Sequence, residues 1–177
     1  MRHLGWLMAG AALAAVPHAA VAQQPAPTGF AAEFWGLFDE SMDKFIALAE
    51  AMPAEKYTWS PGEGVMTVAK VYGHVARYNY LYPATSLKTP APDGRDKDAV
   101  ESMTDKAKLV ALLKESRTHV HDVVKGLSPG QAEETTLYGR KVAQWAVLFQ
   151  LLGHMNEHLG QSIAYARMNG IVPPWSR

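Results

Sequence analysis

The chain reads LLGHMNEHLGQ over residues 151–161, and this stretch carries the strongest signals for both the fold and the site. Within it, His154 and His158 are four residues apart, so on a helix they lie on one face with Cβ atoms roughly 5–6 Å apart. Two imidazoles placed in this way can bind one divalent ion. The stripe that they share begins with apolar residues, which predicts that it faces the interior of a helical bundle. Its members are Val147, Leu151, His154, His158, Gln161 and Tyr165.

The histidine pair alone leaves two readings open. Burying two imidazoles costs free energy unless each finds a partner, and either a shared metal ion or ordinary hydrogen bonds would serve. A third ligand favours the metal, and His74 is the best candidate. It lies beside the apolar face of a predicted helix. Its small neighbours Gly73 and Ala76 would let another helix, or a metal site, approach closely.

Two further histidines compete for this role. His119 and His121 are two residues apart on a predicted helix, so their side chains point in different directions. His119 also stands in a charged string. We therefore expect both at the surface and take His74 as the third ligand.

Apolar residues at three- and four-residue spacing predict four helices. They are expected over about 30–52, 68–83, 102 or 104 to 127, and 141–169. Pro53 and Pro83 are expected to stop the first two helices, Thr67 to cap the second, and Gly170 to form the left-handed C-cap of the last. No alternation typical of strands is found. The prediction is an all-α four-helix bundle with long connecting loops, which permit crossovers.

Composition narrows the class of protein. Of 177 residues, 48% are hydrophobic, and 17 Lys and Arg balance 17 Asp and Glu. These values favour one compact domain and argue against a disordered tail, a collagen-like fibre or an electrostatically driven nucleic-acid binder. There is no cysteine. Disulfides, thiolate metal sites and iron–sulfur clusters are therefore excluded, and any metal must be held by histidines and carboxylates.

The N-terminus has the three parts of a secretory signal peptide. Arg2 gives a positive start, residues 4–16 are apolar but shorter than the ~20 residues that span a bilayer, and Ala20-Val21-Ala22 is an A-x-A cleavage site. The alternative is an uncleaved anchoring segment. We expect an exported protein, in the periplasm or outside the cell, without a stable membrane span after cleavage. The expected divisions are a signal peptide over 1–22, a flexible leader over 23–29 and the bundle domain over 30–177.

Several segments, taken together, resemble the DinB/YfiT-like metal-binding bundles. They are 52–62 (MPAEKYTWSPG), 65–68 (VMTV), 73–76 (GHVA), 154–161 (HMNEHLGQ) and 165–174 (YARMNGIVPP). The resemblance implies a bundle of up-down-down-up topology and makes a homodimer plausible. It also implies a divalent ion, usually zinc or nickel, held by three histidines, which fall on His74, His154 and His158 of this sequence.

Three neutral histidines leave at least one position on such an ion open, which is typical of a catalytic rather than a structural site. The ion would polarise a substrate oxygen, lower the pKa of a water molecule, or bind a thiolate. Characterised members of the family include thiol-dependent transferases and a maleylpyruvate isomerase. Their low-molecular-weight thiols are mainly cytosolic, so a signal peptide counts against a simple transfer of that activity.

Three hypotheses remain from the sequence. In the first, the protein is a metal-dependent transferase or hydrolase that acts on a small molecule through an activated thiol or water. In the second, it is a non-catalytic metal- or ligand-binding protein of the cell envelope. In the third, the histidines hold no metal and the chain is a structural bundle.

Residues near the proposed site are given smaller roles. Glu157 is a candidate acceptor for a ligand histidine or a general base, with a simply exposed glutamate as the alternative. Gln161 is a candidate partner of a ligand histidine or of a water on the ion. Tyr78 and Asn79 are candidates for lining the same cavity. The arginines expected at the surface are Arg77 and Arg167.

Overall fold

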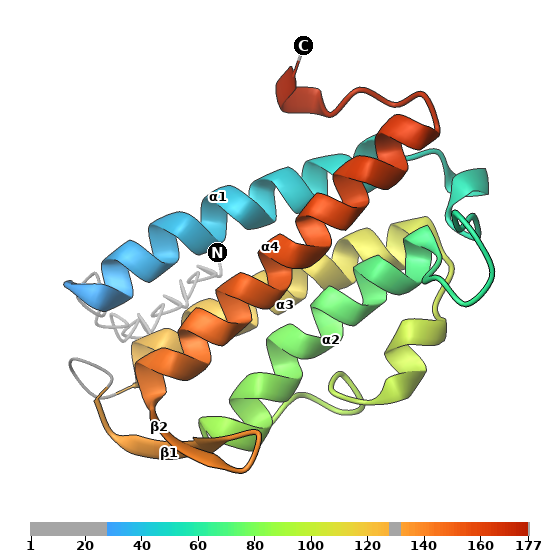
Figure 1. Ribbon diagram of the computed structural model, residues 1–177. Coiled ribbons are helices and arrows are strands. Elements are labelled where there is room, and N and C mark those ends of the chain that lie inside the picture. The colour runs from blue at the N-terminus through green and yellow to red at the C-terminus, as the bar shows by residue number, and fades with distance from the viewer. Residues whose placement is uncertain (1–27, 128–131, 177) are drawn as a thin grey trace, which may run out of the picture.

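The computed structural model describes residues 28–127 and 132–176, and its four helices pack side by side as a bundle (Figure 1). The all-α four-helix class expected from the sequence is confirmed. The expected signal peptide (1–22) and most of the expected leader (23–29) lie outside the described residues. The helices are α1 (Phe30–Ala51), α2 (Val68–Ser86), α3 (Lys106–Gly126) and α4 (Gln144–Met168).

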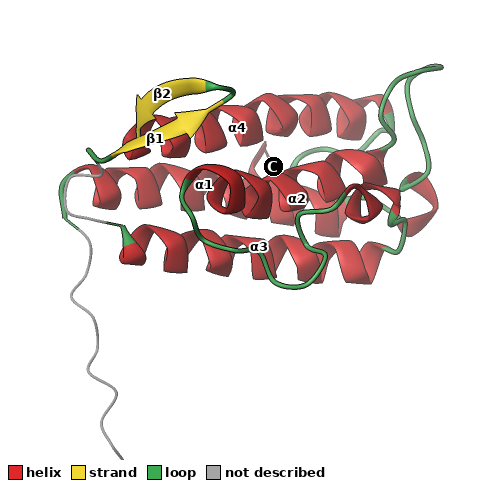
Figure 2. Cartoon of the chain, turned by 90° about the horizontal axis from the view of Figure 1, so that it is seen from below, coloured by secondary structure: helices red, strands yellow, loops and turns green. Residues whose placement is uncertain are grey.

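The helices follow the up-down-down-up order (Figure 1). α1 and α4 run parallel, because Phe30 packs against Trp145 and, further along both helices, Ser41 donates a hydrogen bond to Asn156. α2 and α3 run the other way. Since α2 and α3 share one direction, the chain from 87 to 105 must return along the outside of the bundle, as Figure 2 shows. This return segment carries a short 3-10 helix, η2 (Asp98–Ser102), which packs against α2.

The core is built from the apolar stripes of all four helices. On α1 the buried residues Phe34, Phe38, Met42 and Phe45 follow the helical period. The stripe that begins with Val147 and Leu151 on α4 is buried at those two positions, as expected. Among the described residues, no helix has a stretch apolar and long enough to cross a membrane.

Three helix ends differ from those predicted. α4 begins at Gln144 and not at 141, because residues 140–143 form a strand, β2 (Arg140–Ala143). α3 begins at Lys106, because Asp105 accepts a hydrogen bond from the backbone N–H of Lys108 and so caps the helix there. α2 does not stop at Pro83 but continues to Ser86. Proline loses only its own N–H bond, and the carbonyl of Pro83 still accepts from Leu87, which keeps the last turn helical.

The prediction that the chain has no strands is wrong for 134–143. Strands β1 (Glu134–Leu137) and β2 (Arg140–Ala143) pair antiparallel, with Leu137 opposite Arg140. The two-residue loop is Tyr138-Gly139, with φ of 50° and 75°, which are the backbone angles of a type I′ hairpin turn. Strands of four residues are too short to show a clear alternation, and Tyr-Gly is not one of the residue pairs that usually mark such a turn. The hairpin covers one end of α2 and α4 (Figures 1 and 2).

Candidate metal centre

Three histidines from two antiparallel helices meet inside the bundle. His74 projects from α2, and His154 and His158 project from one face of α4. One ring nitrogen from each lies within 4.8 Å of the others. The Nε2 atoms of His74 and His154 are 3.1 Å apart, and His158 stands 4.7 Å from His154 between ring centroids. The structure therefore brings together the three residues that the sequence selected.

His74 is oriented from behind by a carboxylate. Its Nδ1 lies 2.9 Å from Oε1 of Glu101, a residue of η2 whose side chain is only 13% exposed. A carboxylate accepts, so Nδ1 carries the proton and Nε2 presents its lone pair to the cluster. Arg77 donates to the same Glu101 oxygen at 2.7 Å and also to the carbonyl of Asp96. Arg77 thus fixes the carboxylate that fixes the histidine.

His158 is oriented by a neutral chain of hydrogen bonds. Its Nδ1 lies 2.8 Å from Oε1 of Gln161, and the Gln161 amide donates to the hydroxyl of Tyr165, which in turn donates to the carbonyl of Met66. The amide oxygen only accepts, so Nδ1 of His158 carries the proton and Nε2 is left with a lone pair. Both arrangements follow the usual pattern of metal-binding histidines, in which the second ring N–H is held by a polar partner.

Burial favours the uncharged forms of His74 and His154. It lowers the pKa of His154 to about 3, with the neighbouring His158 and His74 contributing in the same direction. Burial also lowers the pKa of His74, against the opposing effect of Glu101. Burial raises the pKa of Glu101, but the hydrogen bonds from Arg77 and His74 outweigh it and hold that pKa below its usual value. At neutral pH, His74 and His154 are consequently neutral imidazoles beside the ionised carboxylate of Glu101.

This donor set fits a divalent transition-metal ion. Neutral imidazole nitrogens are ligands for zinc, nickel, copper and iron, and two of the three rings are already held with their lone pairs inward. His74, His154 and His158 would hold the ion, with at least one of its positions left for another molecule. The donors themselves do not select one metal from this group.

Other residues named from the sequence fall in different places. The ring of Tyr78 lies tilted against those of both His74 and His154, with ring centroids 4.5 Å away in each case, so it does border the cluster. Asn79 is buried elsewhere and donates to Ser116 at 3.0 Å, which means that it does not line the site. Glu157 is exposed on α4, which agrees with the alternative given above of a simply exposed glutamate.

The surface positions expected for His119, His121 and Arg77 are wrong. His119 and His121 are not free surface residues. Each is half-buried: the ring of His119 lies tilted against that of Tyr80, and His121 is bonded to Asp39 at 2.8 Å. Arg77 is likewise not a surface arginine, since its side chain is 16% exposed and paired with Glu101. Arg167 is exposed, as expected.

Glu101 is the functional residue that sequence reasoning missed. It is 27 residues from His74 and lies in a loop without periodicity. One local signal pointed to its position. A Cβ on Gly73 would meet the carbonyl oxygen of Val100 at 2.8 Å, so Gly73 is the residue that lets η2 lie against α2. The close approach predicted at Gly73 is therefore real, but the neighbour is the backbone of the return segment.

Comparison with known proteins agrees with this architecture. The chain is similar to a DinB-like protein from Bacillus cereus ATCC 10987, with a TM-score of 0.70 and 15% identity over 80% of this chain and 93% of that one. It is also similar to the DinB-like protein YjoA from Bacillus subtilis, with a TM-score of 0.61 and 18% identity over 79% and 93%. No curated protein matches the sequence. A family model described as the DinB superfamily matches residues 37–165, and the chain therefore belongs to the DinB superfamily.

Proposed function

We propose that this protein is an exported metal-dependent enzyme that acts on a small molecule at the centre formed by His74, His154 and His158. The ion is zinc or nickel, and the reaction is a transfer or a hydrolysis. When bound, the ion supplies Lewis-acid chemistry, lowering the pKa of a thiol or a water molecule at its open position.

One observation carries the proposal: two of the three histidines are held by dedicated partners. Glu101 accepts from Nδ1 of His74 at 2.9 Å, and Gln161 accepts from Nδ1 of His158 at 2.8 Å. Such partners fix both the tautomer and the direction of the lone pair, and their loss in metal sites typically lowers affinity about 10–100-fold. Core histidines also need hydrogen-bond partners, but here the partners leave the Nε2 lone pairs of His74 and His158 free within a cluster whose three ring nitrogens lie within 4.8 Å of one another, as a shared ion requires.

The surrounding residues contribute position and exclusion of water. Arg77 keeps Glu101 ionised and in place. Tyr78 and Tyr82 pack against His154 and shield it on the side that faces the hairpin. Burial and the hydrogen bond with Tyr138 raise the pKa of Tyr82, so its hydroxyl stays protonated at neutral pH.

The nucleophile must come from outside the chain if it is a thiol, because the sequence has no cysteine. The expected signal peptide makes the common cytosolic thiols poor cosubstrates. Hydrolysis by water, or transfer to a thiol that is present in the envelope, is therefore the form of the reaction that we favour.

Metal analysis of protein purified without a polyhistidine tag is the first test. We expect about one ion per chain in the wild type and at least a tenfold lower affinity in His158→Ala. The matched control is His121→Ala, which removes a histidine that is bonded to Asp39 outside the cluster. Equal metal content in the wild type and His158→Ala would overturn the metal site, and retained affinity in His74→Ala would remove His74 from the ligand set.

Turnover is tested next, with ester substrates and with electrophiles offered together with low-molecular-weight thiols. Activity that is lost with the metal and restored by Zn²⁺ or Ni²⁺ is expected. Tight metal binding without turnover of any of them would instead support a non-catalytic metal-binding role. Export is tested separately. The protein is recovered from the envelope or the medium of the producing cell, and its mass should correspond to a chain that begins at Gln23, after the expected cleavage site.

A further inference from the structure

A pocket lies beside the histidine cluster, at the end of the bundle that the hairpin covers. Its volume is about 380 Å³, towards the lower end of the roughly 300–1,000 Å³ of small-molecule sites. Its walls come from α2 and the hairpin. The residues that matter below are Tyr78, Leu81 and Tyr82 of α2, and Thr136, Leu137 and Tyr138 of the hairpin.

Two tyrosines connect this pocket to the histidines. Tyr78 lines the pocket, and its ring also lies tilted against those of His74 and His154, with centroids 4.5 Å apart. Tyr82 lines the pocket as well and meets the ring of His154 edge-on at 5.8 Å. The histidines themselves do not line it. A molecule in the pocket would thus lie one aromatic ring away from the cluster, and one end of it would reach an ion there only by passing the rings of Tyr78 and Tyr82.

Tyr138 is the unusual residue of this wall. It occupies the first central position of a type I′ turn at φ 50°, where Asn, Asp or Gly is preferred and a bulky side chain is strained. It is 65% exposed, so core packing does not explain the choice. Its hydroxyl instead contacts that of Tyr82. The hairpin thus holds an aromatic ring over the pocket in a conformation that tyrosine does not favour.

The chemistry of the lining defines the occupant. Three phenol rings and two leucines provide flat apolar surface, a few hydroxyls provide hydrogen bonds, and no lining residue is charged. A charged group buried here would have no ion partner, whereas aromatic rings meet one another with favourable stacked or edge-on geometry. We propose that the pocket binds an uncharged aromatic group of the substrate, and that Tyr138 determines this specificity. The part of the inference that places the reactive end at the histidines rests on the proposed function.

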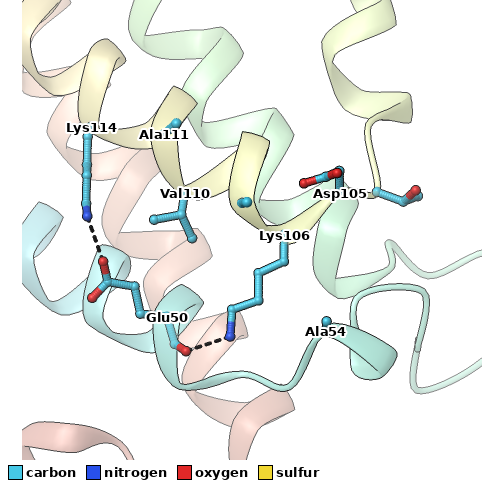
Figure 3. A pocket seen from close by; sticks show the side chains of 9 residues that line it. Glu50, Ala54, Asp105, Lys106, Val110, Ala111 and Lys114 are labelled. Atoms are coloured by element: carbon cyan, nitrogen blue, oxygen red, sulfur yellow. Dashed lines mark hydrogen bonds and ion pairs between the residues drawn. The ribbon is translucent and has the colours of Figure 1, made fainter.

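A larger groove at the opposite end of the bundle does not compete. It lies between α1 and α3, with a volume of about 860 Å³ (Figure 3). Its lysines already have local partners: Lys106 donates to the carbonyls of Glu50 and Met52, the end of α1, and Lys114 pairs with the Glu50 carboxylate. These contacts close a helix end. None of the three histidines lines this groove.

The pocket is tested first in metal-free protein, with benzyl alcohol as the probe and amide shifts in ¹H–¹⁵N NMR as the readout. We expect shifts at residues 136–139 of the hairpin. Binding of benzoate should be at least about fivefold weaker, because the pocket offers its charge no partner. Cyclohexylmethanol, which lacks the ring, should also bind more weakly. Equal affinities for the three probes, or shifts confined to the α1–α3 groove, would overturn the proposal.

Tyr138→Asn separates a role in binding from a role in the turn. Asparagine suits the left-handed conformation, so the melting temperature should stay constant or rise, while the affinity for benzyl alcohol should fall by about fivefold or more. Tyr138→Phe should retain the affinity. Lys141→Ala, on a hairpin residue outside the pocket wall, is the matched control and should change neither quantity. Unchanged binding in Tyr138→Asn would show that this residue does not determine specificity.

A third comparison keeps the two proposals apart. Zn²⁺-loaded protein should bind benzohydroxamate about tenfold more tightly than acetohydroxamate, which has the same chelating group without the ring. If neither binds, the metal centre fails while the benzyl alcohol result still decides the pocket. If both bind equally, the metal centre stands and the pocket does not take the ring of a molecule held at the histidines.

Discussion

Glu101 sets the direction of the His74 lone pair through a single hydrogen bond. Glu101→Gln keeps the shape of the side chain and an accepting oxygen but removes the charge, so the Nδ1 proton is held less firmly. We expect Zn²⁺ affinity, measured by competition with a chromogenic chelator, to fall by roughly tenfold. Asp98→Asn is the matched control, because Asp98 also pairs with Arg77 from η2 but is 90% exposed. An equal effect of both variants would contradict a specific role for Glu101.

The lowered histidine pKa values predict how the stability of the metal-free protein depends on pH. Burial lowers the pKa of His154 to about 3, whereas the unfolded chain titrates near 6.5. Between these values the unfolded state binds a proton that the folded state does not, so stability falls as the pH falls. From pH 7 to pH 5, His154 alone should remove about 2 kcal/mol from the free energy of unfolding.

Burial also lowers the pKa of His74 and His119, so both act in the same direction. Urea unfolding of metal-free protein at the two pH values provides the measurement. In His154→Asn the difference between them should shrink by about the same 2 kcal/mol. Stability that is equal at pH 5 and pH 7, or greater at pH 5, would show that the cluster is not buried as described.

At the scale of elements, the packing of η2 against α2 depends on one missing methyl group. In Gly73→Ala the new Cβ would meet Val100 O at 2.8 Å and the Glu101 Cα at 3.2 Å, and both are backbone atoms that cannot rotate away. The return segment must move, and Glu101 moves with it. We expect a loss of about 1–3 kcal/mol in stability, together with weaker Zn²⁺ binding.

Gly160→Ala is the matched control for this element. Gly160 lies on the exposed side of α4, and its added Cβ would meet nothing within 4 Å. Alanine favours the helix over glycine, so this variant should gain roughly 0.5–1 kcal/mol and leave metal affinity unchanged. If Gly73→Ala behaved in the same way, the close contact between α2 and η2 would be unnecessary for the site.

The elements themselves were predictable to different degrees. Helix α1 was expected from its apolar period, and its end before Pro53 was marked by proline. The end of α2 was not, because burial against neighbouring elements kept the turn after Pro83 helical. The hairpin was not predicted, because strands of four residues are too short to show a clear alternation of apolar and polar residues.

At the scale of the whole molecule, the histidine cluster joins α2 to α4, since His74 and His154 are 80 residues apart in the sequence. An ion bound there binds the folded chain and not the unfolded one. At a free Zn²⁺ concentration of about 100 times Kd, the free energy of unfolding should rise by about 2.7 kcal/mol, which for a domain of this size raises Tm by roughly 5–10 °C.

Thermal unfolding with and without Zn²⁺ measures this stabilisation. His158→Ala should lose it, and His121→Ala should retain it. A similar increase in both variants would mean that Zn²⁺ acts elsewhere on the protein.

The sequence by itself determined what depends on local spacing. A period of 3.6 residues places His154 and His158 on one face, gives the four helices and turns their apolar sides inward, because each of these follows from neighbours within two turns. The choice of His74 as the third member also came from the sequence, through its small neighbours and the resemblance to the DinB family.

Only the tertiary structure decided which residues surround the histidines. The long return from α2 to α3 brings η2 across Gly73, and this path places Glu101 behind His74 and turns Arg77 inward. The hairpin brings Tyr138 to Tyr82 in the same way, from 56 residues away. Contacts of this kind depend on how complete elements pack, and no local period in the chain encodes them.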